Sequence, residues 1–174
     1  MEISKIYFDM DSVLADFKRG VSELCGIVPP EQCPGSKAED DRMWEAIRDC
    51  NHFYDRLEFM PGAEEMFREI YSRYPGRCQI LTGVPKPHRG IEGAGEDKTS
   101  WVRRKLSQDI PVNIVLREEK KNFVTGPGCV LIDDLEKNIR EWEACGGTGI
   151  LYVSPEETLK RLAEIDGKEN RRRK

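Results

Sequence analysis

The sequence predicts an α/β protein with a doubly wound, five-stranded parallel sheet and a small helical cap inserted near its start. Short apolar runs alternate with amphipathic stretches of helical period along most of the 174 residues. Two of these apolar runs end in pairs of aspartates, and residues 15–60 interrupt the alternation. Strands that alternate with helices favour a parallel sheet joined by right-handed crossovers, and the interruption predicts the cap.

The predicted strands are short, continuous apolar runs, which is the pattern of strands buried on both faces of a parallel sheet. Ile6-Tyr7-Phe8 and Val130-Leu131-Ile132 are the clearest of these runs. In chain order the five predicted strands span residues 3–9, 77–82, 112–116, 129–133 and 148–153.

The predicted helices lie between these strands, where apolar residues recur at i, i+3, i+4 and i+7. Pro75-Gly76 stops the first helix, Gly146-Gly147 ends the third, and Ser154-Pro155 caps the start of the fourth. The four helices are expected around residues 63–74, 98–106, 135–145 and 154–165.

Residues 18–60 break the pattern, because their early part is rich in Pro, Cys, Glu and Asp and only the stretch around Arg42–Cys50 has helical character. We expect residues 1–14 and 61–168 to form the core and residues 15–60 to form a small cap. Residues 84–95, with three Gly and two Pro, predict a flexible loop. The basic residues 169–174 predict a disordered tail.

Composition limits the function classes. A net charge of −4 argues against a broad nucleic-acid surface, so we expect no nucleic-acid polymer as a partner. The six cysteines form no Cys-x-x-Cys pair and there are only two histidines, so no zinc pattern is present. We expect reduced thiols in a cytoplasmic protein. No apolar run approaches ~20 residues, and no membrane span is expected.

The acid pair Asp9 and Asp11 follows the first predicted strand directly. Both side chains should project into the crevice beyond the carboxyl end of the strand, where ligands bind in open α/β sheets. Two carboxylates there favour Mg²⁺ and a phosphate, with one acid attacking phosphorus and the other handling the proton. A solvated turn is an equally common reading of an isolated Asp-x-Asp.

Three further features favour a phosphate site over a solvated turn. Asp133-Asp134 ends the fourth predicted strand, and adjacent carboxylates need a nearby cation to stay charged. Thr82 ends the second predicted strand, where a hydroxyl and backbone N–H groups can hold a phosphate oxygen. Lys98, near the start of a predicted helix, is a candidate for the fixed cation that phosphoryl transfer requires.

In this order the four features resemble a known superfamily. Residues 7–17 resemble motif I of the haloacid dehalogenase-like (HAD-like) phosphohydrolases, Thr82 motif II, Lys98 motif III and Asp133-Asp134 motif IV. A closer resemblance is to the 5'(3')-deoxyribonucleotidases, on the segments Asp9–Phe17, Phe53–Ala63, Lys98–Val102 and Leu131–Asp134. This resemblance implies a HAD-like Rossmannoid core with strand order 3-2-1-4-5, whose first and fourth strands meet at the switch point.

The resemblance also implies an activity, that of a Mg²⁺-dependent phosphomonoesterase working through an aspartyl-phosphate. Asp9 would be the nucleophile and Asp11 the general acid–base. The metal ligands would be Asp9, the backbone carbonyl of Asp11, and Asp133, with Asp134 steering water or Lys98 from behind them. Thr82 and Lys98 would hold the phosphoryl oxygens. Substrate contacts are expected from Phe17, Gly83, Arg117 and Lys120.

The sequence departs from the family at three points, of which the last two bear on the substrate. Ser12 replaces a Gly of the family, Gly83 replaces a Ser after the motif II Thr, and the cap is shorter. A deoxyribonucleoside monophosphate is the expected substrate. The alternatives are another small phosphate ester, such as a sugar phosphate, or a phosphate-binding regulator without turnover. Phe17, Trp44 and Phe53 are the aromatic side chains that could stack on a nucleobase, although Trp44 and Phe53 would serve equally well as cap core.

Overall fold

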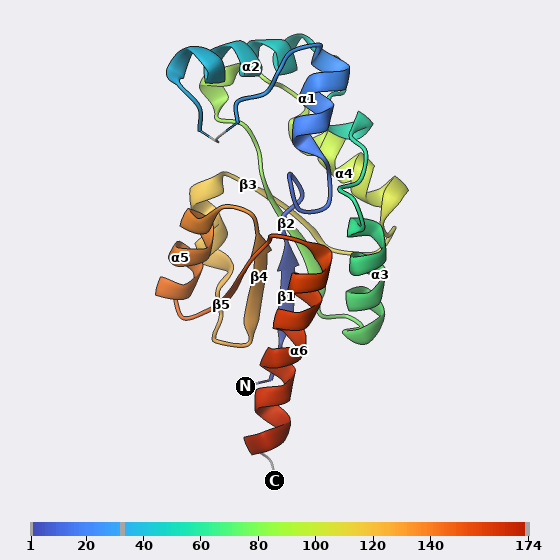
Figure 1. Cartoon of the computed structure of the whole chain (residues 1–174), viewed down its shortest axis with the longest axis vertical. Coiled ribbons are helices and arrows are strands. Elements are labelled where there is room, and N and C mark those ends of the chain that lie inside the picture. Colours follow the sequence, from blue (N-terminus) through green and yellow to red (C-terminus); the bar gives the residue numbers. More distant parts are fainter. Residues whose placement is uncertain (1, 32–33, 173–174) are drawn as a thin grey trace.

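The computed structural model describes residues 2–31 and 34–172, and its centre is a five-stranded parallel sheet (Figure 1). The strand order is β3-β2-β1-β4-β5, as expected. β2 and β4 have the expected length, and the other three strands are shorter than the predicted runs. The strands are β1 (Lys5–Phe8), β2 (Cys78–Gly83), β3 (Val112–Val115), β4 (Cys129–Asp133) and β5 (Thr148–Leu151).

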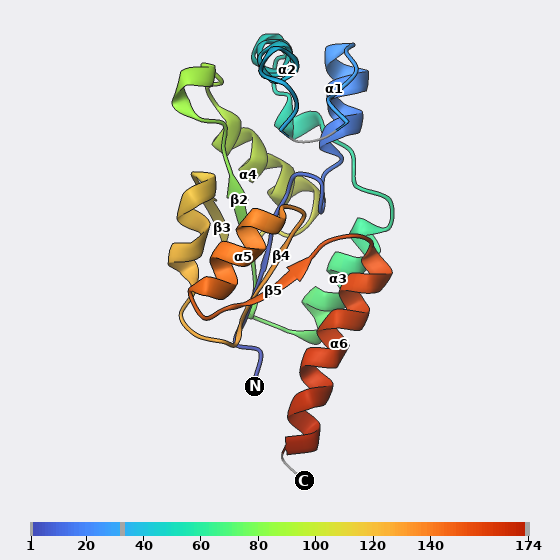
Figure 2. The ribbon, with the colours of Figure 1, turned by 60° about the vertical axis from the view of Figure 1, so that its left-hand side comes forward.

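Helices cover both faces of the sheet (Figures 1 and 2). The alternating direction of strand side chains divides the core into two clusters. Ile6 and Phe8 of β1 belong to the cluster that also holds residues of α3 (Ala63–Arg73), α4 (Ala94–Lys105) and α6 (Pro155–Arg172). Tyr7 belongs to the other cluster, with Trp142 of α5 (Glu136–Ala144). Both faces are therefore dry, as the continuous apolar runs predicted.

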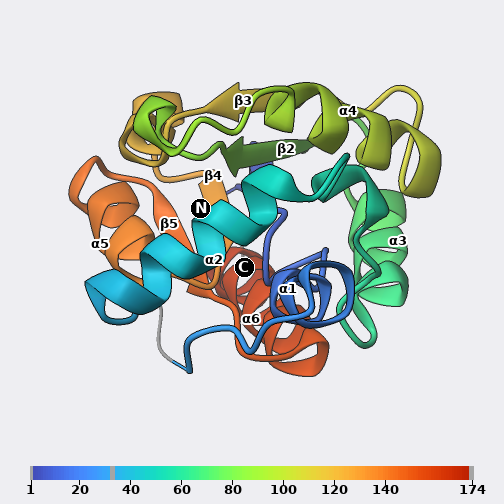
Figure 3. The same cartoon turned by 90° about the horizontal axis from the view of Figure 1, so that it is seen from above.

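The cap stands above the carboxyl ends of the strands (Figures 1 and 3). It contains α1 (Phe17–Cys25), α2 (Lys37–Asp49) and the 3₁₀ turn η1 (Tyr54–Arg56). The expectation of a single helix around Arg42–Cys50 was incomplete, because α2 begins earlier and α1 was not predicted. Asp16 caps α1 by accepting a hydrogen bond from the Arg19 backbone N–H. Gly20 lets α1 approach the core, since a Cβ there would clash with Leu57.

Two further segments differ from expectation. The loop predicted over residues 84–95 includes a 3₁₀ turn, η2 (Pro87–Arg89), and ends where α4 begins at Ala94, ahead of Lys98. The tail predicted to be disordered over residues 169–174 continues α6 as far as Arg172, and residues 173–174 lie outside the described residues. Across the described part of the chain, no helix is long and apolar enough to cross a membrane.

Candidate active site

The loop after β1 is a fixed support for its two aspartates. Met10 is fully buried, and its carbonyl accepts hydrogen bonds from the backbone N–H groups of Leu14 and Ala15. The backbone N–H of Ser12 donates to the Ala15 carbonyl, and Ser12 has the left-handed φ of 62°. Glycine adopts this conformation without strain, which explains why the family that this loop resembles has Gly at the position of Ser12. The loop folds tightly back on itself, so the two carboxylates have different surroundings.

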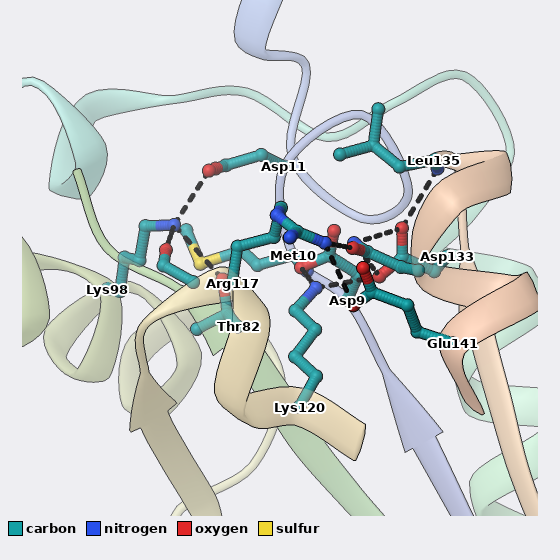
Figure 4. A network of polar contacts seen from close by, with 12 residues as sticks. Asp9, Met10, Asp11, Thr82, Lys98, Arg117, Lys120, Asp133, Leu135 and Glu141 are labelled. Atoms are coloured by element: carbon teal, nitrogen blue, oxygen red, sulfur yellow. Dashed lines mark hydrogen bonds and ion pairs between the residues drawn. The ribbon is translucent and has the colours of Figure 1, made fainter. Parts of the chain in front are cut away.

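Asp9 is buried and faces a lysine (Figure 4). The Lys120 ammonium lies 2.9 Å from Asp9 Oδ1 and 2.7 Å from Asp133 Oδ2, and the Met10 N–H donates to the same Asp9 oxygen. Asn138 donates to both oxygens of Asp133, at 3.0 and 2.9 Å. Lys120 comes from η3 (Arg117–Phe123), so a turn after β3 supplies the cation between the ends of β1 and β4.

Asp11 turns away from this group towards a second lysine (Figure 4). Lys98 Nζ, fully buried, donates to Asp11 Oδ2 at 2.7 Å, to Thr82 Oγ1 at 3.0 Å and to the Gly83 carbonyl at 2.6 Å. The ring of Tyr54 lies beneath the same ammonium, 4.6 Å from centroid to nitrogen. Asp11 Oδ1 is buried and, among the described residues, has no hydrogen-bond partner. This oxygen therefore lacks the hydrogen bond that a buried carboxylate oxygen usually has.

Three carboxylates gather beside the ends of β1 and β4. Atoms of Asp9, Asp133 and Asp134 lie within 4.8 Å of one another. Burial, and then the charges of Asp9 and Asp133, raise the pKa of Asp134 to about 8. Burial and Asp9 also raise the pKa of Asp133, against the opposing effect of Lys120. Burial alone would lower the pKa of Lys120, but Asp9 and Asp133 outweigh it and the pKa is raised.

This donor set fits a hard divalent cation. Three carboxylates against one lysine leave an excess of negative charge, and carboxylate oxygens are the ligands that Mg²⁺ prefers. Asp134 is therefore a possible direct ligand of the cation. From the sequence we expected it to steer water or Lys98 and not to bind the cation. Burial, and then Asp9, raise the pKa of Asp11, while Lys98 opposes the rise. The Asp11 side chain is not part of the three-carboxylate group.

A cavity of about 460 Å³ connects these acids to the cap. The cap side of its lining is largely aromatic and apolar, whereas its floor is polar. The lining includes Asp9, Asp11, Phe17, Met43, Trp44, Tyr54, Gly83, Lys86, Arg117, Lys120, Asp134 and Asn138.

The structure brings all ten predicted site residues into this region, and six of them form two groups; the other four, Phe17, Gly83, Arg117 and Asp134, line the cavity. Thr82, Lys98 and Asp11 form one group, and Asp9, Lys120 and Asp133 the other. Arg117 lines the cavity and donates to Asn138 Oδ1 (2.8 Å) and Glu141 Oε2 (3.2 Å).

Of the three candidate stacking aromatics, Phe17 and Trp44 line the cavity. Phe53 is buried in the core instead, with its ring 5.6 Å from that of Phe17. Tyr54 and Asn138 line the cavity but were missed by sequence reasoning. Tyr54 carries no motif, and the only signal for Asn138 was its place one turn into the helix after Asp133-Asp134.

Comparison with solved structures supports the fold. Similar chains include a hydrolase from Streptococcus pneumoniae TIGR4 (TM-score 0.53, 12% identity, covering 94% of this chain and 100% of that one). Another is a HAD-superfamily hydrolase from Ehrlichia chaffeensis (TM-score 0.51, 14% identity, 88% and 90% covered). At these identities the likeness concerns the fold alone. The sheet order and this likeness therefore define the fold as that of the HAD-like α/β proteins.

Sequence comparison gives the family. A family model described as "5' nucleotidase, deoxy (Pyrimidine), cytosolic type C protein" matches residues 2–162, and the chain belongs to that family. A protein of Vibrio phage KVP40, named "Putative 5'(3')-deoxyribonucleotidase", is 31% identical over 134 residues, covering 76% of this chain and 67% of the relative. The protein is thus a phosphatase-type hydrolase of the 5'-nucleotidase kind, which implies a small nucleotide as substrate.

Proposed function

We propose that this protein is a Mg²⁺-dependent 5'(3')-deoxyribonucleotidase that works through an aspartyl-phosphate on Asp9. One observation carries the proposal: the two carboxylates of a single loop have separate partners at the floor of one cavity. Asp9 is held by Lys120, and Asp11 by Lys98 beside Thr82. Two acids in different surroundings can take different roles, which a simple anion-binding site would not require.

The nucleophilic step uses Asp9. The Lys120 and Met10 donors both engage Oδ1, so we assign Oδ2 as the attacking oxygen. Oδ2 forms a bond to phosphorus while the bond from phosphorus to the leaving alkoxide breaks. We assign the Thr82 hydroxyl and the fixed charge of Lys98 to the phosphoryl oxygens, where this charge would stabilise the transition state. Because the Lys98 ammonium already donates to Asp11, Thr82 and the Gly83 carbonyl, a phosphoryl oxygen would replace one of these three acceptors.

The proton transfers use Asp11. Protonated Asp11 gives its proton to the leaving alkoxide in the first half-reaction. In the second half-reaction, Asp11 accepts a proton from the water that attacks phosphorus, and inorganic phosphate and Asp9 are released. The orphaned Oδ1 is the oxygen we assign to this role, because Oδ2 is engaged by Lys98.

Asp9, Asp133 and Asp134 are the residues that would hold Mg²⁺, together with the Asp11 carbonyl implied by the family resemblance. When bound, the ion would neutralise the excess carboxylate charge and attract the phosphate ester. Lys120 stays between Asp9 and Asp133 as a permanent partner, so the phosphate meets a fixed positive charge beside the nucleophile.

The aromatic part of the cavity supports a nucleoside as the leaving group. Phe17, Trp44 and Tyr54 line the space above the acids, and flat, apolar side chains suit a nucleobase better than a sugar. A cavity of about 460 Å³ lies within the range of small-molecule sites. The description of the family and the name of the phage relative also support a nucleotide as the substrate.

A substrate panel tests the proposal. With Mg²⁺ present, deoxyribonucleoside monophosphates should be hydrolysed with higher kcat/KM than sugar phosphates. Asp9→Asn should abolish turnover, and Asp11→Asn should lose ~10²–10⁴-fold with nucleotides but less with p-nitrophenyl phosphate, whose leaving group needs no proton. Asp109→Asn, at an exposed aspartate, is the matched control.

Three results would contradict the proposal. Preference for sugar phosphates would favour a phosphatase of another ester, and binding without turnover would favour a regulator. Near wild-type hydrolysis by a folded Asp9→Asn variant would exclude Asp9 as the nucleophile.

A further inference from the structure

We propose that Arg89 and Asp41 form a latch that holds cap helix α2 over the reaction cavity and positions Trp44 against the leaving group of the substrate. The proposal rests on the proposed function for the identity of that leaving group. Arg89 and Asp41 are far apart in the chain and belong to different parts of the molecule. Arg89 ends η2, which follows Thr82 and Gly83 of the core, whereas Asp41 lies in α2 of the cap.

The contact between them is close and partly shielded. Arg89 Nη1 lies 2.6 Å from Asp41 Oδ1, with side-chain exposures of 24% and 35%. Figure 2 shows η2 rising beyond the ends of the strands to the level of α2. Partial shielding from water makes such a pair stronger than a fully exposed one.

The same guanidinium reaches the cavity lining. The Arg89 guanidinium carbon lies 5.8 Å from the centre of the Trp44 ring, within the range of a cation–π contact. Asp41 and Trp44 are three residues apart on α2 and so share a face of the helix. One arginine of the core therefore contacts both the anchor of the cap helix and an aromatic side chain that lines the cavity.

Trp44 also meets the first residue of α1. The ring centroids of Trp44 and Phe17 lie 6.1 Å apart at an interplanar angle of 52°, and both rings line the cavity. A change in the position of Trp44 would thus alter the aromatic wall on both cap helices. Arg89 is paired with Asp41 of the cap and does not line the cavity that holds Asp9 and Asp11. We therefore assign Arg89 as a positioning residue and not a catalytic one.

A matched control exists on the same carboxylate. Lys37 pairs with Asp41 Oδ2 at 2.6 Å, but it lies in the same helix and its side chain is 91% exposed. Lys37→Met removes a charge partner of Asp41 without breaking a contact between cap and core. Arg89→Met and Asp41→Asn break that contact, and Arg89→Lys restores the charge without the planar guanidinium.

The first measurement is acrylamide quenching of tryptophan fluorescence, which is independent of turnover. The chain has three tryptophans, and Trp101 and Trp142 are fully buried, so quenching reports on half-buried Trp44. Arg89→Met and Asp41→Asn should both raise the quenching constant, and Lys37→Met should leave it unchanged. The double variant should equal the single variants, because either substitution alone already breaks the latch.

The second measurement compares a deoxyribonucleoside monophosphate with p-nitrophenyl phosphate in the same variants. Loss of the latch should raise KM for the nucleotide about fivefold to tenfold and change kcat little, since a displaced stacking partner weakens binding. Values for p-nitrophenyl phosphate should stay within about twofold. Arg89→Lys should recover part of the nucleotide KM.

The outcomes separate the two proposals. If Arg89→Met and Asp41→Asn both behave like Lys37→Met in quenching, the latch is refuted, whatever the substrate. If Arg89→Met raised the quenching constant and Asp41→Asn did not, the latch between these two residues would also be refuted. If quenching rises as expected but the wild type prefers sugar phosphates, the latch stands and the nucleotidase proposal fails.

Discussion

Two lysines serve the two aspartates of the catalytic loop. The sequence singled out Lys98 as the cation that faces the phosphoryl group, and Lys98 contacts Asp11 and Thr82. The structure adds Lys120, 2.9 Å from Asp9 and 4% exposed. Lys120 was expected only among the substrate contacts. Its position beside Asp9 suggests that both lysines are needed for turnover, in different ways.

Lys98→Met and Lys120→Met are each expected to lower kcat by ~10²-fold or more, because each removes a fixed charge beside developing negative charge. Lys121→Met, at the exposed neighbour, should be close to wild type. Steady-state kinetics measure the effects. Circular dichroism confirms folding, since Lys120→Met removes the cation that two buried carboxylates share. If Lys121→Met proves as damaging as either, the assignment of both lysines is wrong.

Ser12 carries local strain, because a non-glycine residue in the left-handed region costs about 1–2 kcal/mol. Ser12→Gly should therefore raise the free energy of unfolding by about 0.5–1 kcal/mol, after allowing for the greater freedom of Gly in the unfolded chain. Urea denaturation measures the change. The control is Ser22→Gly, at an exposed position inside α1, which should lower stability. A loss of stability in Ser12→Gly would show that the strain is absent.

At the scale of elements, α1 joins the catalytic loop to the cap. Phe17 is the first residue of α1 and directly follows Asp16, the N-cap residue of that helix. Its ring contacts those of Trp44, Phe53 and Tyr54. The start of α1 therefore sets the position of an aromatic side chain in the wall of the cavity that Asp9 and Asp11 also line. The element that the sequence failed to predict is thus the one that carries an expected substrate residue.

Phe17→Ala should erase the preference for nucleotides, because base stacking contributes about 1–3 kcal/mol per base. We expect kcat/KM for a deoxyribonucleoside monophosphate to fall at least about fivefold, while p-nitrophenyl phosphate is spared. Phe59→Ala is the matched control, because Phe59 packs on Trp101 and is not part of the cavity lining. Equal losses for both substrates in Phe17→Ala would assign Phe17 to the structure of the cap only.

At the scale of the whole molecule, the fold brings together carboxylates that repel one another. β1 and β4 are neighbours in parallel register, so Asp9 and Asp133 meet although they lie 124 positions apart in the chain, and Asp134 adds a third carboxylate. The metal-free protein should be less stable for this reason, since buried like charges cost free energy that a bound cation offsets.

Mg²⁺ is accordingly expected to raise the melting temperature of the wild type. At a concentration 100 times Kd the stabilisation would be about 2.7 kcal/mol. In Asp133→Asn the rise should be much smaller, because a ligand is lost, whereas Asp109→Asn should keep it in full. Thermal denaturation with and without Mg²⁺ measures both effects. Equal shifts in Asp133→Asn and the wild type would place the ion elsewhere.

The sequence by itself determined the strands, the core helices and the acids at the strand ends, because hydrophobic period and strand-end position are local properties of the chain. Through its motif order it also indicated the sheet order that the structure has. The tertiary structure alone decided which lysine meets which aspartate, since Lys98 and Lys120 are both basic residues in ordinary polar segments. It also decided that Tyr54 and Asn138 line the cavity. Such contacts depend on how distant elements pack, and no local pattern records that packing.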